Sequence, residues 1–516
     1  MNFSGKLKQP LSPVDATSLQ NSPLMGRSGL GKVLLIYVAP EDSNYQMGGK
    51  GFYKIVRRPQ LGFVYISGTL KRVGIDHDIL DQTCELFDER DIIRICREEN
   101  VAWVGFYTVD ALILKVTLFL QRIRKALPEQ LLVVGGPGTL LSRPYLDAGA
   151  DIAVLGEGEY ASIELCEYAA GLRDLEDIQN IIYLRDKQIV QTAPREPADL
   201  DLLPHPNRDL IDVNMYRDLL IVNNRLPYTT MITSRGCPFT CSFCTSPTVW
   251  TRKVRQRSVN NVLEEIDILV SKYGIKYISF QDDIFGLSKR WLVDFCRQLS
   301  DRKYDLNWMC ILHPTSFRNH RGEMLDHMKE AGLNTISIGV QSADPEVLGN
   351  ISRREEETEL GYELIQEAKA RQILTGTAMI VGLPGDTEET IQRSLDFTLR
   401  CRPHHAMFYK LTVLKGSPLD TPEKNAIKCS LTNEELQKWV RRATLRFNFD
   451  PKVFGQMVVY ILRNNPRWLW TAVKVAPTLI GVLGLLKTNG ARPDKSDGPP
   501  TTCGGYTPLR GGIRSC

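Results

Sequence analysis

Two blocks of the chain alternate short apolar runs with longer helix-like stretches, and this alternation limits the possible folds more than any other feature. The first block has five such runs, at residues 33–37, 76–81, 101–106, 131–134 and 152–155. Strands buried on both faces are apolar throughout, and helical crossovers join parallel strands. We therefore predict an α/β protein whose residues 31–195 form a doubly wound, Rossmann-like domain.

The second block predicts another parallel sheet. Its six apolar runs lie at residues 229–233, 277–280, 307–311, 335–339, 377–381 and 406–414. Six βα units indicate a partial (β/α)6 TIM-type barrel, which we place at residues 226–420. Residues 196–225 combine prolines and acids without periodicity and are expected to link the two domains. The remaining segments are predicted as a flexible tail, a helical extension and a disordered tail, at residues 1–30, 421–487 and 488–516 respectively.

Composition narrows the functional classes. The 516 residues carry a formal net charge of only +4, so we expect no nucleic-acid partner. The twelve cysteines are mostly isolated in a chain too large to need disulfides, which favours a reducing cytoplasm. We also expect the protein to be a monomer. Residues 468–486 are the most apolar segment, but Lys474 and Pro477 interrupt it. We favour a buried or membrane-surface helix pair there, with peripheral membrane contact, over a true span.

Three cysteines in the loop after the first strand of the second block carry the sharpest chemical signal, at Cys237, Cys241 and Cys244. Three thiolates from one short loop can ligate three irons of a 4Fe-4S cluster and leave the fourth iron open. Structural zinc requires a fourth protein ligand, and the nearest downstream cysteine or histidine is Cys296, in a helix-like stretch. A disulfide would leave one thiol over, and polar residues between the cysteines argue against unrelated core positions.

This CxxxCxxC spacing after the first strand of a βα barrel resembles the radical S-adenosylmethionine (SAM) enzymes. The resemblance implies that S-adenosyl-L-methionine binds the open iron and that other strand-end residues hold it: Phe243 the adenine; Gln281, Asp282 and Asp283 the amino group; Gln341 and Ser342 the ribose; Arg353 or Arg354 the carboxylate; and Gly382 a fifth-strand turn. Each has a simpler alternative. The aspartates could cap a helix, Gly382 could be an ordinary turn glycine, and the arginines could form a solvated face.

Glycines follow the last two strands of the first block. Gly135 and Gly136 follow one strand, and Gly156, Glu157 and Gly158 follow the next. Glycines at the carboxyl ends of parallel strands let the backbone approach a bulky ligand. Together with the Asp-Leu-Asp-Leu-Leu-Pro linker at 199–204, this pattern resembles the cobalamin-binding domain of cobalamin-dependent radical SAM enzymes. The contact candidates are Tyr107, Thr108, Gly135, Gly136, Gly156, Glu157 and Gly158.

Two alternatives remain for this domain. It could be a Rossmann-like scaffold that has lost its ligand, and Glu157 could simply favour the start of a helix through the helix dipole. Many cobalamin domains carry DxHxxG in the loop after the first strand, but residues 39–51 contain no histidine here. His77 falls in a strand-like run, so we expect a structural role for it and no histidine on the lower face of the cobalt.

The resemblance implies a cobalamin-dependent radical SAM methyltransferase that modifies an unactivated carbon of a small molecule through a 5′-deoxyadenosyl radical and methylcobalamin. A cyclase or ring-rearranging enzyme of lipid or tetrapyrrole metabolism is one alternative, and a non-catalytic iron–sulfur or cobalamin sensor is another. The cluster implies a flavodoxin or ferredoxin type electron donor. No catalytic acid or base is assigned, because His313 could equally face the barrel mouth or begin a helix.

Overall fold

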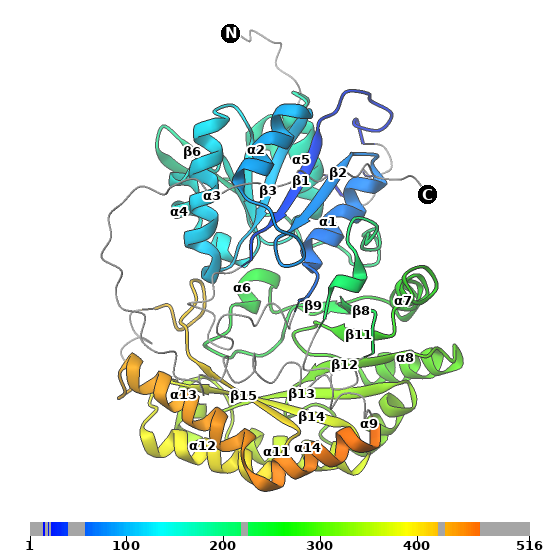
Figure 1. Cartoon of the computed structure of the whole chain (residues 1–516), viewed down its shortest axis with the longest axis vertical. Helices are drawn as coiled ribbons and strands as arrows, with labels where there is room; N and C mark the ends of the chain where they lie inside the picture. Colours follow the sequence, from blue (N-terminus) through cyan, green and yellow to red (C-terminus); the bar gives the residue numbers. More distant parts are fainter. Residues whose placement is uncertain are drawn as a thin grey trace, which may run out of the picture.

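The structure is a computed structural model that describes residues 14–15, 19, 22–39, 57–217, 225–421 and 429–464. Figure 1 shows two units stacked along the long axis, the first built on the amino-terminal sheet and the second on the later one. Each unit has its own hydrophobic core. We call them the amino-terminal domain and the barrel domain.

The amino-terminal domain is built on one seven-stranded sheet, whose order is β2-β1-β3-β4-β5-β6-β7. The strands are β1 (Lys32–Tyr37), β2 (His77–Asp81), β3 (Val101–Tyr107), β4 (Leu132–Gly135), β5 (Ile152–Val154), β6 (Ile181–Arg185) and β7 (Gln188–Gln191). β1 to β5 are parallel, which confirms the predicted doubly wound sheet. The helices are α1 (Leu61–Arg72), α2 (Glu89–Glu98), α3 (Ile113–Ala126), α4 (Ser142–Asp147) and α5 (Glu159–Ala169), with 3₁₀ turns at Asp110–Leu112, Pro137–Leu141 and Leu175–Asp177.

The hairpin β6–β7 was not predicted. It pairs antiparallel with β5 and closes one edge of the sheet. Its second strand is mostly exposed, so it lacks the continuous apolar run that marked the others. The signal that could have found it is the turn at Asp186 and Lys187, both with φ near the left-handed region, at 51° and 65°.

Part of the amino-terminal segment differs from the expected loose tail. Val14, Leu19 and Leu24 are at most 5% exposed and belong to the core of the amino-terminal domain. The backbone N–H of Val14 also donates to Glu164 Oε1 at 2.9 Å. Spaced apolar residues in a Ser- and Pro-rich segment have no helical or strand period, so the sequence pattern did not reveal this packing.

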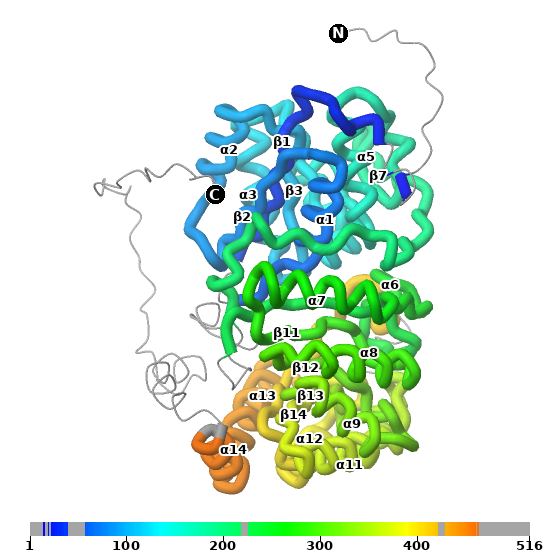
Figure 2. The backbone as a smooth tube through the Cα atoms, turned by 90° about the vertical axis from the view of Figure 1, so that its right-hand side faces the viewer, coloured from blue at the N-terminus to red at the C-terminus, as the bar shows by residue number. Residues whose placement is uncertain are grey.

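The barrel domain contains a six-stranded, all-parallel sheet in the order β15-β14-β13-β12-β11-β8. The strands are β8 (Tyr228–Met231), β11 (Tyr277–Phe280), β12 (Asn307–Leu312), β13 (Leu333–Gln341), β14 (Leu374–Val381) and β15 (His405–Lys410). The crossover helices are α7 (Val259–Tyr273), α8 (Lys289–Asp301), α9 (Arg321–Glu330), α11 (Glu356–Ala370) and α12 (Glu388–Cys401), and Figure 2 shows the first three following one another along the outside. The predicted partial barrel is confirmed.

Shorter elements complete the described chain. They are a 3₁₀ turn at Val213–Met215, the two-stranded sheet of β9 (Ser234–Arg235) and β10 (Arg255–Gln256), α6 (Ser246–Trp250), α10 (Pro345–Asn350), α13 (Asn433–Asn448) and α14 (Pro451–Asn464). The apolar segment 468–486 lies outside the described residues. Among the described helices, none has the length and apolar character needed to cross a membrane.

Candidate functional site

A cavity of about 880 Å³ lies between the two domains. The carboxyl ends of β3, β4 and β5 supply one wall, through Tyr107, Gly135, Gly136, Gly156, Glu157 and Gly158. The carboxyl ends of β8 and β11 supply the opposite wall, through Thr230, Ile232, Ser234, Arg235, Gln281 and Asp283. Ligands of open α/β sheets and of βα barrels bind at these strand ends. The volume is near the upper end of the range for ligand pockets, roughly 300–1,000 Å³.

The glycines on the first wall are needed by the backbone. Gly136 has φ +99°, and a Cβ there would lie 2.8 Å from the carbonyl oxygen of Thr108 and 2.9 Å from the Tyr107 ring. Gly156 has φ +64°, which also favours glycine. Of the predicted contact residues, six line the cavity and Thr108 does not. Thr108 is fully buried, and its hydroxyl donates to the carbonyl oxygen of Gly135 at 3.1 Å.

The cavity continues inward between the first sheet and α5. The inner lining residues are Leu35, Trp103, Gly105, Val133, Ser162, Leu165 and Ile182. Gly105 carries the Trp103 ring directly above its backbone, because a Cβ there would lie 2.6 Å from that ring. The cavity is therefore lined by apolar residues of the amino-terminal domain as well as by residues of both domains at the strand ends.

The three predicted metal ligands lie in one loop that follows β9. Cys237, Cys241 and Cys244 are partly buried and free of disulfides. Burial raises the pKa of the Cys237 thiol to about 11 and also raises the pKa values of the Cys241 and Cys244 thiols. Two of the sulfurs receive N–H donors, Cys244 from the backbone of Ser246 at 3.4 Å and Cys241 from Arg353 at 3.8 Å.

Within the described ranges, no three His, Cys, Asp or Glu side chains are arranged to hold a single metal ion.

Arg353 reaches the cysteine loop and Arg354 does not. The Arg353 guanidinium donates to Glu357 and to the carbonyl oxygen of Gly339, the latter at 2.9 Å, whereas the Arg354 side chain is 79% exposed. His313 lies beside the same carboxylate, with 3.5 Å between His313 Nε2 and Glu357 Oε2. Its ring stacks on Phe239 at a centroid distance of 3.8 Å. Burial and then the charge of Arg353 lower the pKa of His313 to about 3, so this imidazole is neutral at pH 7.

Only two of the three residues predicted for the SAM amino group line the cavity. Gln281 and Asp283 do so, and Asp283 Oδ2 accepts a 2.6 Å hydrogen bond from Ser246. Asp282 is fully buried and accepts hydrogen bonds from the backbone N–H and hydroxyl of Thr233 and from the Ser234 hydroxyl. Asp282 therefore holds the strand that leads to the cysteine loop. The alternative of a helix cap is wrong, because Ser288 caps α8.

The remaining strand-end candidates, Gln341, Ser342, Gly382 and Phe243, are not among the residues that line the cavity. Gln341 ends β13 with φ +73°, and its amide lies over Gly339. Ser342 is buried, and its hydroxyl accepts from the backbone N–H of Asp344 at 3.1 Å, next to the start of α10. Gly382 begins the turn after β14 with φ +93°. Phe243 packs against the apolar group of Val347, Leu348, Ile351 and Leu383.

The sequence did not reveal the ion pairs that join the two domains at the cavity, although Glu157 was itself a predicted contact residue. Arg235 forms ion pairs with Glu157 at 3.0 Å and with Glu159, and Arg255 donates to Glu157 at 2.5 Å. Glu157 is therefore occupied by arginines of the barrel domain. The signal was the arginine next to Gly236 and Cys237, two residues before the first cysteine, which had no assigned role.

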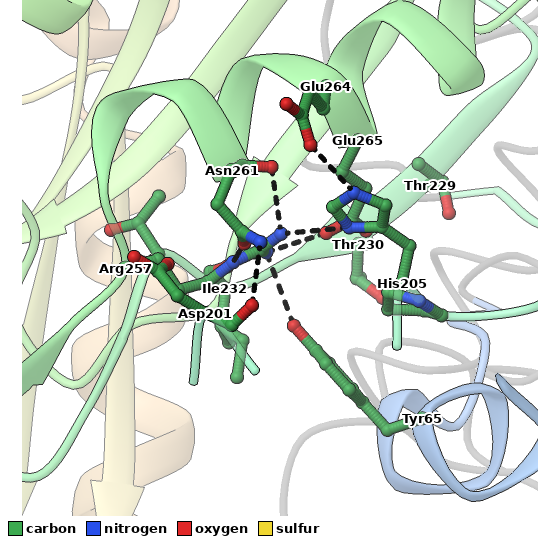
Figure 3. Close-up of polar contacts among 12 residues, drawn as sticks. Tyr65, Asp201, His205, Thr229, Thr230, Ile232, Arg257, Asn261, Glu264 and Glu265 are labelled. Atoms are coloured by element: carbon green, nitrogen blue, oxygen red, sulfur yellow. Dashed lines mark hydrogen bonds and ion pairs between the residues drawn. The ribbon is translucent and has the colours of Figure 1, made fainter. Parts of the chain in front are cut away.

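A second charged network lies behind the first, and Figure 3 shows it. The carboxylate of Glu265 accepts from Arg257 at 2.6 Å and from Arg208 at 3.0 Å, and all three side chains are at most 2% exposed. Tyr65 of α1 extends toward the same network, and its hydroxyl accepts from Arg257 at 3.3 Å. Although burial opposes ionisation, the charges of Arg257 and Arg208 hold the pKa of Glu265 below its usual range.

The chain matches two family models. Residues 231–398 match the radical SAM superfamily, and residues 57–165 match the B12 binding domain. The first range contains the three cysteines and the second contains Gly135, Gly136 and Gly156–Gly158.

Similar proteins include a methyltransferase and a cyclase. An uncharacterised methyltransferase of Pyrococcus horikoshii is 28% identical over 425 residues, which cover 77% of this chain and 89% of that protein. The anaerobic magnesium-protoporphyrin IX monomethyl ester cyclase of Cereibacter sphaeroides is 26% identical over 396 residues, which cover 75% of this chain and 63% of the cyclase.

A solved structure has a similar fold over most of this chain. It is the radical SAM methyltransferase TsrM from Kitasatospora setae, with cobalamin and a 4Fe-4S cluster bound. The TM-score is 0.60 at 20% identity, and the match covers 75% of this chain and 73% of TsrM. At this identity the likeness shows the fold.

Proposed function

We propose that this chain, which belongs to the cobalamin-dependent radical SAM enzymes by its B12-binding and radical SAM domains, is a methyltransferase acting on an unactivated carbon of a small molecule. One observation carries the proposal. A single cavity joins the glycine-lined strand ends of the amino-terminal domain to the strand ends beside the cysteine loop. Two cofactors placed at these two walls would meet within one space.

The residues present fit a 4Fe-4S cluster. Cys237, Cys241 and Cys244 would hold it, and the N–H donors from Ser246 and Arg353 would stabilise the sulfurs in their charged form. Polar atoms near the loop also await a ligand. Ser242 Oγ and His313 Nε2 are buried with no hydrogen-bond partner among the described residues. Buried polar atoms normally have partners, so unpaired ones beside a donor set indicate a bound group.

The other wall fits cobalamin. Gly135 lines the cavity, and a Cβ there would meet nothing within 4 Å, so its backbone is open to a ligand, while the apolar lining residues of the amino-terminal domain would contact apolar parts of that ligand. On the facing wall Thr230 lines the cavity, and its buried Oγ1 has no hydrogen-bond partner within the described chain. His77 is buried in β2 and hydrogen-bonded to Ser67 and Ile75, as a structural histidine should be.

Bound together, the cluster and SAM would supply a one-electron route to a substrate radical, and cobalamin a methyl carrier. The protein binds, orients and excludes water. Gln281 and Asp283 present polar atoms to the cavity where the SAM amino group is expected, and Arg353 is the one arginine of the pair placed to meet its carboxylate. No side chain of the described site is assigned as an acid or base, and neutral His313 is held by Thr315 at 2.7 Å.

The cyclase of Cereibacter sphaeroides supports a second candidate, ring formation with the same cofactors. The assay that separates the candidates is anaerobic. The cluster is reconstituted, hydroxocobalamin, methyl-labelled SAM and a reductant are added, and 5′-deoxyadenosine and label on the corrin are measured by mass spectrometry. Both products support methyl transfer, whereas deoxyadenosine without corrin labelling supports ring formation. Neither product from fully loaded protein would favour a sensor. Cys241→Ala is the control that should lose deoxyadenosine.

We also propose an electron donor, an oligomeric state and a cellular compartment for this protein. A flavodoxin or ferredoxin type protein would reduce the cluster, and the enzyme would act as a monomer in the cytoplasm. The free state of every cysteine that the structure describes supports a reducing compartment.

Peripheral membrane contact is a further part of this proposal. Phe449, Phe454, Val459 and Leu462, in and just before α14, are between 47% and 60% exposed. From residue 451 to 493 the sequence has no acid, six Lys or Arg residues and two tryptophans. Basic, Trp-containing apolar segments bind anionic membrane surfaces. We place the surface of an anionic bilayer against α14.

A further inference from the structure

Arg235 of the barrel domain lines the cavity and contacts the amino-terminal domain there. It lies on β9, two residues before Cys237, and its side chain is only 4% exposed. Its Nη1 lies 3.0 Å from Glu157 Oε1, and its Nη2 donates to Glu159 Oε1. Both glutamates lie in or directly after the glycine segment Gly156–Gly158, which forms part of the proposed cobalamin wall.

The charges of this junction balance. Arg255 is the register partner of Arg235 in the antiparallel β9–β10 pair, and it also binds Glu157. Two arginines of the barrel domain therefore face two glutamates of the amino-terminal domain. Although burial opposes ionisation, the Arg235 charge and the Arg255 hydrogen bond hold the pKa of Glu157 below its usual range. The carboxylate of Glu157 is therefore ionised. Separating it from its arginines inside the protein would cost free energy, because a buried charge would be left without a partner.

Two aromatic rings enclose the same guanidinium. The Tyr65 and Trp250 ring centroids are each 5.0 Å from Arg235 Cζ, and both rings line the cavity. A planar guanidinium can stack on rings and present a fork to carboxylates at the same time, which a lysine ammonium cannot do. The position is therefore specific for arginine rather than for a positive charge.

We propose that Arg235 is a positioning residue that fixes the position of the cysteine loop relative to the glycine segment Gly156–Gly158. A ligand bound at either wall then changes the affinity of the other wall for its own ligand. The proposal rests on the proposed function for the identity of the two occupants. A ligand pressed against Gly156–Gly158 displaces Glu157 and Glu159, and their motion passes to Arg235 and so to Cys237. Because coupling between sites is reciprocal, a filled cysteine loop should also raise the affinity of the opposite wall.

The first test needs no cofactor. Amide hydrogen exchange of the full chain is compared between wild type, Glu157→Gln and Glu167→Gln. Glu167 is the matched control, a buried glutamate of α5 that binds Arg173 at 2.7 Å. Glu157→Gln should speed exchange in residues 236–245 at least about fivefold, the low end of typical coupling energies. Glu167→Gln should leave that segment unchanged. Equal exchange in the segment for wild type and Glu157→Gln would overturn the proposal.

The second test measures the coupling itself. Hydroxocobalamin affinity is measured by absorbance with and without the reconstituted cluster, in wild type, Arg235→Lys and Arg173→Lys. We expect the cluster to tighten binding about fivefold or more in wild type and in Arg173→Lys, and to change it less than about twofold in Arg235→Lys. Added cobalamin should also alter the electron paramagnetic resonance spectrum of the reduced cluster in wild type and Arg173→Lys, but not in Arg235→Lys.

The outcomes separate the two proposals. Wild-type coupling retained in Arg235→Lys would overturn the positioning role while leaving the enzyme assignment intact. Wild-type protein that binds no hydroxocobalamin would overturn the proposed function, and the exchange experiment would still decide whether Glu157 and Arg235 hold the cysteine loop.

Discussion

Asp386→Asn should stabilise the protein at neutral pH, because the native carboxyl is buried at a cost. Asp386 lies in the turn after β14 and is 2% exposed. Its Oδ2 accepts the backbone N–H groups of Gly382 and Leu383, both at 2.8 Å, and its Oδ1 accepts the Thr390 hydroxyl at 2.8 Å. Asparagine can keep all three contacts. Its carbonyl would accept the two N–H groups, and its amide would donate to Thr390, which already donates to the Thr387 carbonyl.

The magnitude follows from the pKa. Burial raises the pKa of Asp386 from 3.8 to about 6. At about 1.36 kcal/mol per pKa unit, the charged carboxylate costs the fold about 3 kcal/mol. The folded state binds the proton more tightly, so this stability is fully present below the unfolded pKa and is lost as the pH rises through 6. Wild type should recover about half of it between pH 8 and pH 5.

The assay is urea unfolding of the full chain at pH 8 and pH 5, followed by circular dichroism. Asp386→Asn should exceed wild type in free energy of unfolding by about 3 kcal/mol at pH 8 and by about half as much at pH 5. Asp396→Asn, the same change at an exposed position of α12, should stay within about 0.5 kcal/mol of wild type. A variant no more stable than wild type at pH 8, or an advantage that does not depend on pH, would refute the reasoning.

Three further predictions test other parts of the molecule. Glu265→Gln leaves Arg208 and Arg257 buried without a counter-charge and should cost about 3–5 kcal/mol in urea unfolding, whereas Glu264→Gln, 66% exposed next to it, should cost less than about 0.5 kcal/mol; equal effects would contradict the buried network. Gly136→Ala should lose about 1–3 kcal/mol in urea unfolding, while Gly135→Ala, with nothing within 4 Å of its added Cβ, should keep the wild-type free energy of unfolding; similar losses in both would contradict the steric argument. Replacing Phe454 and Leu462 together by serine should abolish sedimentation with anionic phosphatidylglycerol vesicles without lowering stability, and undiminished sedimentation would exclude α14 from the contact.

The strands of both sheets could be predicted because a buried parallel strand leaves a local mark. Most predicted runs are rich in apolar or β-branched residues, and each became a strand within a few residues of its expected bounds, although residues 76–81 contain only Ile79 and Leu80 as apolar residues. The hairpin β6–β7 escaped because β7 is exposed and paired only at the sheet edge. The burial of Val14 and Leu24 escaped because it depends on a surface that only the folded domain creates.

The candidate site also has parts that could be predicted from the sequence and parts that could not. The cysteine triplet and the glycine segments are short motifs whose spacing is itself the chemical signal, so the sequence alone identified them together with the cofactors they suggest. The direction of a side chain is a different matter. Asp282 and Asp283 are neighbours, yet one faces the core behind β8 and the other the cavity, because successive residues point to opposite sides of an extended segment.

From the sequence by itself we could determine the two α/β domains, the parallel order implied by their crossovers, and the three cysteines that suit an iron–sulfur cluster. Only the tertiary structure decided that Glu157 meets Arg235 and Arg255, that Arg353 rather than Arg354 reaches the cysteines, and that both sets of strand ends open into one cavity. The physical reason is the distance along the chain over which each interaction acts. Hydrophobic period and ligand spacing act within a few residues, whereas charge pairing between residues about 80 to 100 apart exists only after the domains dock.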